Sequence, residues 1–211
     1  MSDGLVSNVS LVIGFSASDV NSSLVRLAGI AGAIAGSVSM AAGEWISISA
    51  QNELAQREIA IESRSLSVNE AAEQEELAQM YQGHGMQPET ARQAADQVMR
   101  NPKNALIVHS REELGLDPVA LPSAWKAAGL SFICFLVGAL LPVIPWYVTS
   151  GEAAKVASVV IGVAAAAVLG WLIGQFADRN RWFSTLRQVA ILLVACAVTY
   201  AIGRLLNVTV S

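Results

Sequence analysis

The sequence predicts an all-α membrane protein with five spans and a helical metal-binding module inserted between spans 2 and 3. Three observations favour this fold class. The 211 residues are 54% hydrophobic and only 14% charged, whereas soluble domains carry about a quarter charged residues. Several apolar segments approach or exceed the roughly 20 residues that a membrane helix needs. The chain also lacks the alternating pattern of a half-buried strand.

The predicted spans lie on either side of one polar stretch. Apolar runs occupy residues 4–17, 27–50, 127–148, 156–176 and 188–203. The first run is too short to cross a bilayer alone, so we expect a further turn or two of helix upstream of Met1. Arg204 ends the short last run and can extend its charged group to the interface. We expect domains at residues 1–50, 51–118 and 119–211.

The polar stretch at residues 49–118 is acidic and helical in pattern. It contains twelve acids and six bases, a net charge of −6, while the rest of the chain has seven bases and five acids. The helix of span 2 continues without a breaker to about residue 65, and residues 67–70 (SVNE) have the form of a capping box. Glycine and proline signals then delimit three further helices, at about residues 70–83, 88–101 and 103–114.

Charge patterning also predicts an orientation and excludes one class of partner. Residues 178–187 carry three arginines, and basic loops between spans face the cytoplasm. Treated as such a loop, this segment places the N-terminus and residues 49–118 in the cytoplasm and the C-terminus outside. Nucleic acid is not an expected partner, because neutralising phosphates requires a basic surface.

The sequence contains no pattern typical of an enzyme or of a bound cofactor. No nucleotide-binding glycine motif, zinc motif or nucleophile–base arrangement is present. Cys134 and Cys196 lie within apolar runs and are interpreted as small core residues. We therefore predict a protein that is not an enzyme and has no cofactor, embedded in membrane lipid.

Span 2 carries a stripe of residues with four-residue spacing. Gly32, Gly36, Met40 and Glu44 lie on one slowly drifting face of the helix. Glycines allow another helix to approach closely, so the stripe can be a packing seam with Met40 as filler. An acid within a span is costly and typical of an ion path, although Glu44 can also be an interfacial residue.

Asp3 is the second acid at predicted membrane depth. If helix precedes it, Asp3 is an intramembrane carboxylate that can exchange a proton for a cation, because burial raises and a nearby cation lowers a carboxyl pKa. If Met1 is the true start, Asp3 is a terminal residue in water. Both interpretations remain open from the residues alone.

The acidic module contains three pairs that each share a helix face. Spacings of three or four residues place the members of a pair on the same side. The pairs are Glu58 with Glu62, Glu73 with Glu76, and His109 with Glu113. They can converge on a metal site, or they can be ordinary solvated faces.

Four motifs and the acidic helices together resemble the vacuolar iron transporter family. The motifs are DGLVSNVSLVIG at residues 3–14, SVSMAAGEWIS at 37–47, REELGLDP at 111–118 and GALLPVIP at 138–145. The resemblance implies a homodimer of five-span protomers that exchanges ferrous iron for protons along a path between the protomers. Plant and fungal members load iron into vacuoles and bacterial members occupy the plasma membrane, which we expect here.

The resemblance also implies roles for individual residues. Asp3 and Met40 fall on the ion path, and the cytoplasmic metal-binding glutamates fall on Glu62, Glu73, Glu76 and Glu113. This chain departs from plant members at four positions. Another metal-site glutamate corresponds to Ser65, a methionine pair corresponds to His109 and Ser110, and an acid of the second span corresponds to Gly32.

These observations predict a transporter that moves a divalent transition metal out of the cytosol in exchange for protons. Imidazole binds several such metals, so manganese remains open beside ferrous iron. The thioether of Met40 disfavours magnesium and calcium, which prefer oxygen ligands. The alternative is a non-transporting membrane protein that holds or oxidises iron at the glutamates and uses its spans only as an anchor.

Overall fold

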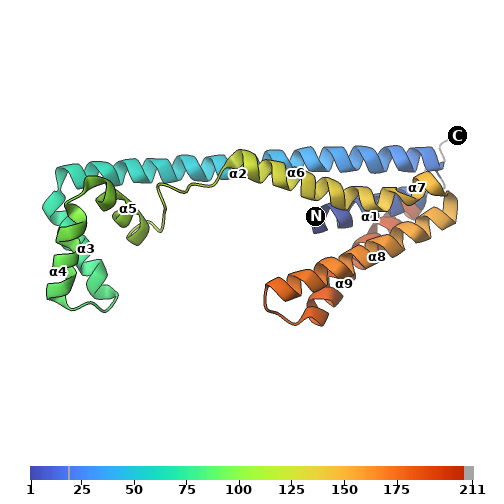
Figure 1. The fold of residues 1–211 in the computed structure, drawn as a ribbon. Helices are drawn as coiled ribbons and strands as arrows, with labels where there is room; N and C mark the ends of the chain where they lie inside the picture. Colours follow the sequence, from blue (N-terminus) through green and yellow to red (C-terminus); the bar gives the residue numbers. More distant parts are fainter. Residues whose placement is uncertain (19, 207–211) are drawn as a thin grey trace. The chain divides into compact units, whose positions relative to one another are not determined.

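The computed structural model describes residues 1–18 and 20–206, and within these residues it contains helices and no strands. The prediction of an all-α fold is confirmed. The chain divides into two compact units, one formed by residues 1–44 with 125–211 and the other by residues 45–124. We call them the membrane unit and the polar unit. Helix α2 (Ser22–Val68) contributes residues to both units (Figure 1).

Four of the helices are long and apolar enough to cross a membrane. They are α2, α6 (Ala124–Leu140) with the 3₁₀ turn Leu141–Val143, α8 (Gly151–Phe176) and α9 (Arg181–Leu206). Helix α1 (Ser2–Ser16) has 15 residues, about 22 Å of helix, which is less than the roughly 30 Å of a bilayer core. It does not by itself meet the length of a span.

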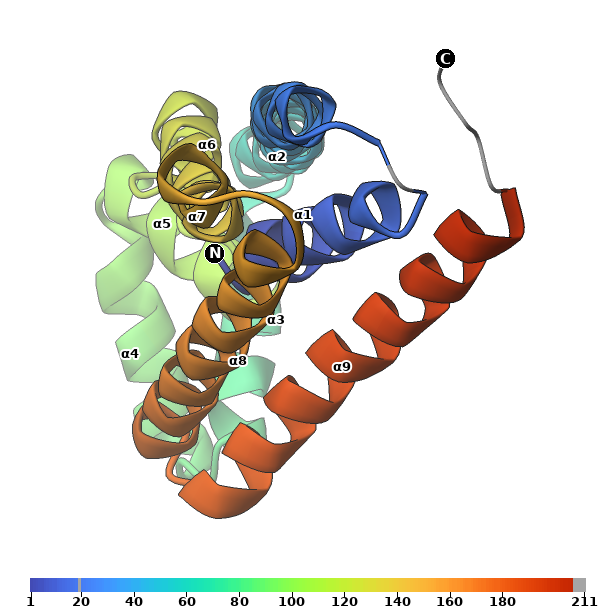
Figure 2. The ribbon, with the colours of Figure 1, turned by 90° about the vertical axis from the view of Figure 1, so that its right-hand side faces the viewer.

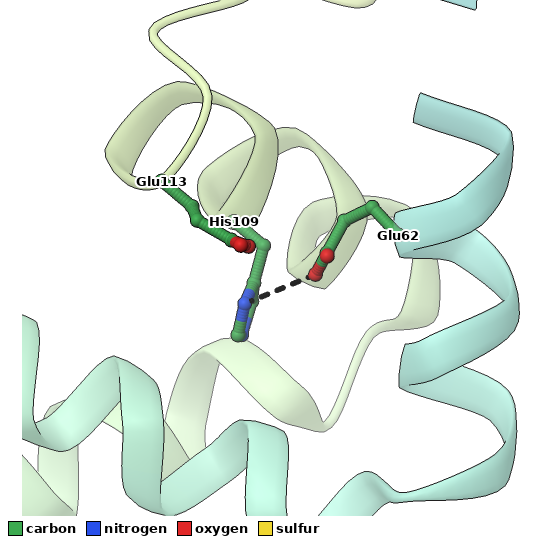
Figure 3. Close-up of side chains that lie close together, drawn as sticks. All are labelled: Glu62, His109 and Glu113. Carbon is green, nitrogen blue, oxygen red and sulfur yellow. Dashed lines mark ion pairs between the residues drawn. The ribbon is translucent and has the colours of Figure 1, made fainter. Parts of the chain in front are cut away.

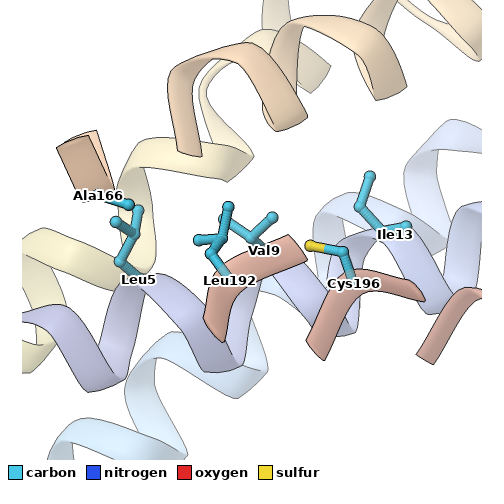
Figure 4. Packing of buried hydrophobic residues seen from close by; sticks show 6 residues of the cluster. All are labelled: Leu5, Val9, Ile13, Ala166, Leu192 and Cys196. Atoms are coloured by element: carbon cyan, nitrogen blue, oxygen red, sulfur yellow. The ribbon is translucent and has the colours of Figure 1, made fainter. Parts of the chain in front are cut away.

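Although α1 is short, it lies at the centre of the membrane unit. Leu5, Val9 and Ile13 are buried on one face of α1 and pack against Ala166 of α8 and against Leu192 and Cys196 of α9 (Figure 4). Figure 2 shows α1 beside α8 and α9. The apolar pattern that suggested a membrane segment at residues 4–17 is therefore explained by burial against two long helices.

Helix α8 makes its close contacts through a stripe of small residues. Every fourth residue on one face is buried and small: Ala154, Ser158, Gly162, Ala166, Gly170 and Gly174. A Cβ added at Gly170 would lie 2.7 Å from the Cα of Thr185, and one at Gly174 would lie 2.8 Å from the Cα of Arg181. Small residues let the backbones of membrane helices approach closely. Gly170 and Gly174 pack against α9, whereas Gly162 faces Val9 of α1.

The third predicted span is interrupted near its end. Helix α6 stops at Leu140 and is followed by the 3₁₀ turn and by α7 (Pro145–Val148). The backbone oxygen of Ala139 accepts a 2.5 Å hydrogen bond from the Nδ2 group of Asn8, which also donates to the oxygen of Gly29 at 3.0 Å. Because Asn8 is 2% exposed, this amide links α1, α2 and α6 inside the membrane unit.

The polar unit comprises the second part of α2 and three short helices. These are α3 (Glu70–Gly83), α4 (Pro88–Met99) and α5 (Pro102–Glu112), close to the predicted limits. Leu77, Ala78 and Ala95 form its small core, with Tyr81, Val98 and Val108 around them. The predicted continuation of span 2 into this unit is confirmed, since α2 runs unbroken through Val68.

Two local predictions are wrong. The predicted capping box does not form, because Ser67 still belongs to α2 and its hydroxyl donates to the oxygen of Arg64. Asn69 is the N-cap of α3 and makes no side-chain capping bond. The predicted loop at residues 178–187 is mostly helix, because α9 begins at Arg181 and the connection is a short turn.

Candidate metal centre

Three helices of the polar unit bring ionisable side chains together. Glu62 lies on α2, Glu73 on α3 and His109 near the end of α5, whose C-cap is Glu113. Asn101 caps the start of α5 by accepting from the N–H groups of Lys103 and Asn104. The cap and the neighbouring proline fix where α5 begins, and therefore which of its faces carries His109.

The imidazole of His109 is the centre of the cluster. Its Nδ1 atom lies 3.3 Å from Oε1 of Glu62 and 3.8 Å from Oε2 of Glu73. One ligand atom from each of Glu62, His109 and Glu113 lies within 4.8 Å of the other two (Figure 3). Atoms at these separations can bind one metal ion together, since metal–oxygen and metal–nitrogen bonds are about 2.0–2.2 Å long.

Burial distinguishes this cluster from a solvated acidic surface. His109 is 0% exposed, Glu62 6% and Glu73 7%. Within the described part of the chain, both ring nitrogens of His109 and Oε1 of Glu62 are buried without a hydrogen-bond partner. A buried polar atom without a partner costs free energy, so these atoms call for a ligand, and a cation satisfies both carboxylate and imidazole.

The surroundings of Glu62 raise its pKa from 4.5 to about 7. Removal of the carboxylate from water is the largest cause, and the negative charges of Glu113, Glu73 and Glu76 add to it. Both effects disfavour the ionised form. A bound divalent cation would reverse the second effect, so metal binding at this position would favour proton release from Glu62.

The other predicted ligands take up different places. Glu113 and Glu76 are exposed at the edge of the cluster, and Glu76 acts on Glu62 through its charge. The Ser65 hydroxyl donates a short hydrogen bond to Oε1 of Glu73, which orients that carboxylate. Glu58 is half-buried on α2 and does not belong to the three-residue group of Glu62, His109 and Glu113.

The predicted path residues lie on the surface of the membrane unit. Asp3 is exposed in the first turn of α1, and Met40 is 40% exposed on α2. Gly4, next to Asp3, lies against the backbone of Phe135, and Gly36, one turn before Met40, lies against the ring of the same residue. Residues close in sequence to Asp3 and Met40 therefore contact Phe135 of α6, but both path residues are themselves exposed in a single chain.

The remaining residues of the span 2 stripe have two kinds of surroundings. Gly32 faces α1, where an added Cβ would lie 2.9 Å from Oδ1 of Asn8, and Gly36 faces the Phe135 ring. Both glycines therefore pack against other helices of the same unit. Glu44 is half-buried and is the last residue of the first segment of the membrane unit.

Sequence reasoning missed two features of the membrane unit. Asn8 carries a signal that could have been used, because an amide within an apolar helix is unusual and suggests an interhelical hydrogen bond. The small-residue stripe of α8 is also visible as a four-residue period. Which helices these residues contact is not encoded by the spacing and required the structure.

Comparisons with known proteins identify the family to which this chain belongs. The model of the VIT family matches residues 1–204. The chain is similar to Vacuolar iron transporter 2 of Oryza sativa subsp. japonica, with 28% identity over 205 residues that cover 97% of this chain and 83% of the relative. It is also similar to Vacuolar iron transporter 1 of Arabidopsis thaliana, with 27% identity over 208 residues, 98% of this chain and 83% of the relative.

Another relative has a higher sequence identity over a shorter part of the chain. Vacuolar iron transporter of Acanthamoeba castellanii is 34% identical over 120 residues, which cover 57% of this chain and 45% of the relative. The family match and the four helices suited to a bilayer identify an integral membrane protein. This chain belongs to the VIT family.

Proposed function

We propose that this protein carries ferrous iron out of the cytosol in exchange for protons, with manganese as a competing cargo. The proposal rests on the buried cluster of Glu62, Glu73 and His109. Oε1 of Glu62 and both ring nitrogens of His109 have no hydrogen-bond partner there. Such atoms suit a divalent cation, and the relatives covering most of the chain are named iron transporters.

The donor set supports a transition metal of intermediate softness. Imidazole together with carboxylates is a common ligand set for iron, manganese and zinc, whereas magnesium and calcium prefer oxygen alone. Neither cysteine belongs to the polar unit, so thiolate is not among its ligands. Ferrous iron and manganese are therefore the cargoes that we place first.

The ion path is proposed to lie between two copies of the chain and to require five spans. Asp3 and Met40 are exposed on a single chain, so a path that uses them needs a second surface to enclose it. A homodimer supplies that surface by symmetry. In this arrangement α1 crosses the membrane as the first span, Glu44 lies toward the cytoplasmic entrance, and the metal passes Asp3 and Met40.

The orientation that fits this function places the polar unit in the cytoplasm, where it collects the metal. The arginines at the turn between α8 and α9 favour the same side, and the C-terminus is then outside. We propose the bacterial plasma membrane as the location, whereas the relatives named above are called vacuolar transporters.

The test is a flux assay in proteoliposomes with a pH gradient imposed in either direction. Ferrous iron, manganese, cobalt and zinc are supplied in turn, and an internal dye reports proton movement. We expect metal flux coupled to proton counter-flux, lost in Asp3→Ala and in Met40→Ala. Val38→Ala is the control and should transport normally, because this exposed residue of α2 lies two positions from Met40 and therefore on nearly the opposite face of the helix.

The same assay separates transport from the alternative function. A membrane-anchored iron-binding or ferroxidase protein would bind or oxidise ferrous iron without vectorial flux. Metal binding that depends on Glu62, together with an absence of flux for every metal and gradient, would support the alternative. Flux that is unchanged in both Asp3→Ala and Met40→Ala would contradict the proposed path.

A further inference from the structure

The turn that joins α8 and α9 is built by specific backbone contacts. Asp178 has a positive φ of 49°, and the N–H of Arg179 donates to the oxygen of Gly174 at 2.9 Å. This is the bonding pattern of a Schellman helix end. Asn180 then starts α9 by accepting from the N–H of Phe183 at 3.2 Å. The connection between the two helices therefore has one defined geometry.

Three exposed arginines gather at this turn. They are Arg179, Arg181 and Arg187, and none of them forms an ion pair with a carboxylate among residues 1–18 and 20–206. The guanidinium of Arg181 lies over the ring of Trp171, 5.2 Å from its centroid. Asp178 is the single acid in residues 177–187, while residues 156–176 and 188–203 carry no charge.

Large apolar side chains surround the same turn. Phe176 is 86% exposed and Trp182 is 80% exposed, and Phe183 and Leu186 are exposed as well. Both α8 and α9 can span a membrane, so a four-residue connection between them must lie close to a bilayer surface. Aromatic rings are favoured at the depth of lipid head groups, where these side chains and the arginines would be found together.

Two basic residues elsewhere in the membrane unit have partners within the protein. Lys155 is paired with Glu152 at 2.6 Å, and Arg26 donates to the backbone oxygen of Trp146 at 3.2 Å. The arginines at the turn differ from these two residues, because no carboxylate in the described part of the chain pairs with them. Their positive charge is unpaired on the side where the apolar side chains are also unpaired.

We propose that residues 176–187, which we call the arginine turn, bind the head groups of anionic phospholipids. The guanidinium groups of Arg179, Arg181 and Arg187 would pair with lipid phosphate, and Phe176, Trp182 and Phe183 would contact the glycerol and upper acyl region. Each basic residue near an anionic membrane surface strengthens binding by about fivefold. The inference does not depend on which metal is carried.

The experiment compares two triple variants of the full chain that remove the same positive charge. The turn variant is Arg179→Gln, Arg181→Gln and Arg187→Gln, and the control is Arg26→Gln, Lys155→Gln and Arg204→Gln. Purified proteins are exposed to mixtures of phosphatidylglycerol and phosphatidylcholine, and retained lipids are counted by native mass spectrometry. Thermal unfolding in detergent reports whether each variant is folded.

We expect the wild type and the control to retain phosphatidylglycerol over phosphatidylcholine, and the turn variant to lose at least tenfold of this preference. Survival of the preference in the turn variant, or an equal loss in the control, would overturn the proposal. Should the triple variant fail to fold, Arg179→Gln and Arg187→Gln are measured singly, with a several-fold loss expected from each.

A separate arm distinguishes lipid from a free anion. Inorganic phosphate at millimolar concentration is added to the wild type carrying phosphatidylglycerol. Retention of the lipid supports a surface that recognises the head group together with its apolar part. Displacement of the lipid by phosphate would mean that the arginines form a site for a small anion, and would overturn the proposal.

Discussion

The two units of this protein bury different kinds of polar group. In the described part of the membrane unit, the buried polar side chains are the neutral ones of Asn8, Ser10, Ser37, Ser158, Ser184 and Gln188. In the polar unit they include Glu62, Glu73 and His109. Both units are helical, so the difference lies in chemistry and not in secondary structure.

This difference reflects what each unit packs against. Ionised groups are costly in a bilayer, whereas amides and hydroxyls can satisfy backbone oxygens of neighbouring helices, as Asn8 and Ser158 do. The polar unit has many exposed charged side chains, yet it buries two carboxylates around an imidazole. Burying like charges is unfavourable without a compensating partner, so the cluster supports the proposed metal site better than it supports a stabilising role.

The largest expected effect is the loss of metal binding in Glu62→Gln. The substitution keeps the shape of the side chain but removes a charge and a ligand atom at the centre of the cluster. Because changes at residues that only support metal ligands cost about 10–100-fold, we expect the affinity for manganese to fall about 100-fold. Isothermal titration measures it.

Glu58→Gln is the matched control for that experiment. It removes the same charge from the same helix one turn away, outside the three-residue group. We expect a change below about twofold, because Glu58 supplies no ligand atom to that group. Equal losses in the two variants would mean that general acidity, and not the cluster, attracts the metal.

The membrane unit is tested next by Gly170→Ala, which we expect to destabilise it by about 2 kcal/mol. The new Cβ would lie 2.7 Å from the Cα of Thr185, and overpacking of a tight contact costs about 1–3 kcal/mol. Gly129→Ala on α6 meets nothing within 4 Å and should be neutral or slightly stabilising. Thermal unfolding in detergent measures the stability of both variants. Equal stabilities would contradict the close contact at Gly170.

A third prediction concerns how metal affinity depends on pH. We expect the affinity to be about tenfold lower at pH 6 than at pH 8, because Glu62 becomes protonated. Its pKa is raised to about 7, so the carboxyl is mostly ionised at pH 8 and mostly protonated at pH 6. The protonated form is a poor ligand, and affinity therefore decreases as pH falls.

Titrations at pH 6, 7 and 8 isolate this contribution when wild type and Glu62→Gln are compared. The variant cannot titrate at position 62, so its dependence on pH should be weaker than that of the wild type by about tenfold over this range. Identical pH profiles would show that Glu62 does not release its proton when metal binds.

The smallest expected effect is that of Asn8→Leu, about 1 kcal/mol of destabilisation. The substitution keeps the volume of the side chain but removes two interhelical hydrogen bonds, and such bonds in membrane proteins contribute about 0.6 kcal/mol on average. Ser16→Ala, which removes a bond within α1 itself, is the control. Both variants are compared by thermal unfolding in detergent. A larger loss of stability in Ser16→Ala than in Asn8→Leu would contradict the role of Asn8 as a link between helices.

Local sequence pattern was enough to predict several features of this chain. The long apolar runs predicted four helices that can cross a membrane, and Pro88, Pro102 and Gly115 delimited short helices correctly. These features depend on composition and on residues that are near one another in sequence. The capping box failed for the opposite reason, since continuation of α2 through Val68 made Ser67 an interior helical residue.

Other features depend on contacts between distant residues. The four-residue spacing places Glu58 and Glu62 on the same face of a helix and does not distinguish them. The packing of α2, α3 and α5 brings Glu62 close to His109 and leaves Glu58 outside the metal-ligand group. The roles of Asp3, Met40 and Glu44 remain predictions. The apolar run at residues 4–17 could not reveal that α1 is buried between α8 and α9.

The sequence alone determined the helical class, the limits of most helices and the separation of apolar from acidic segments, because these follow from propensity and from the period of hydrophobic residues. Only the tertiary structure decided which carboxylates are buried, which glycines are contacts and which backbone oxygens Asn8 satisfies. The physical reason is that burial and desolvation depend on all helices packed around a group, and these come from positions as far apart as residues 8 and 139.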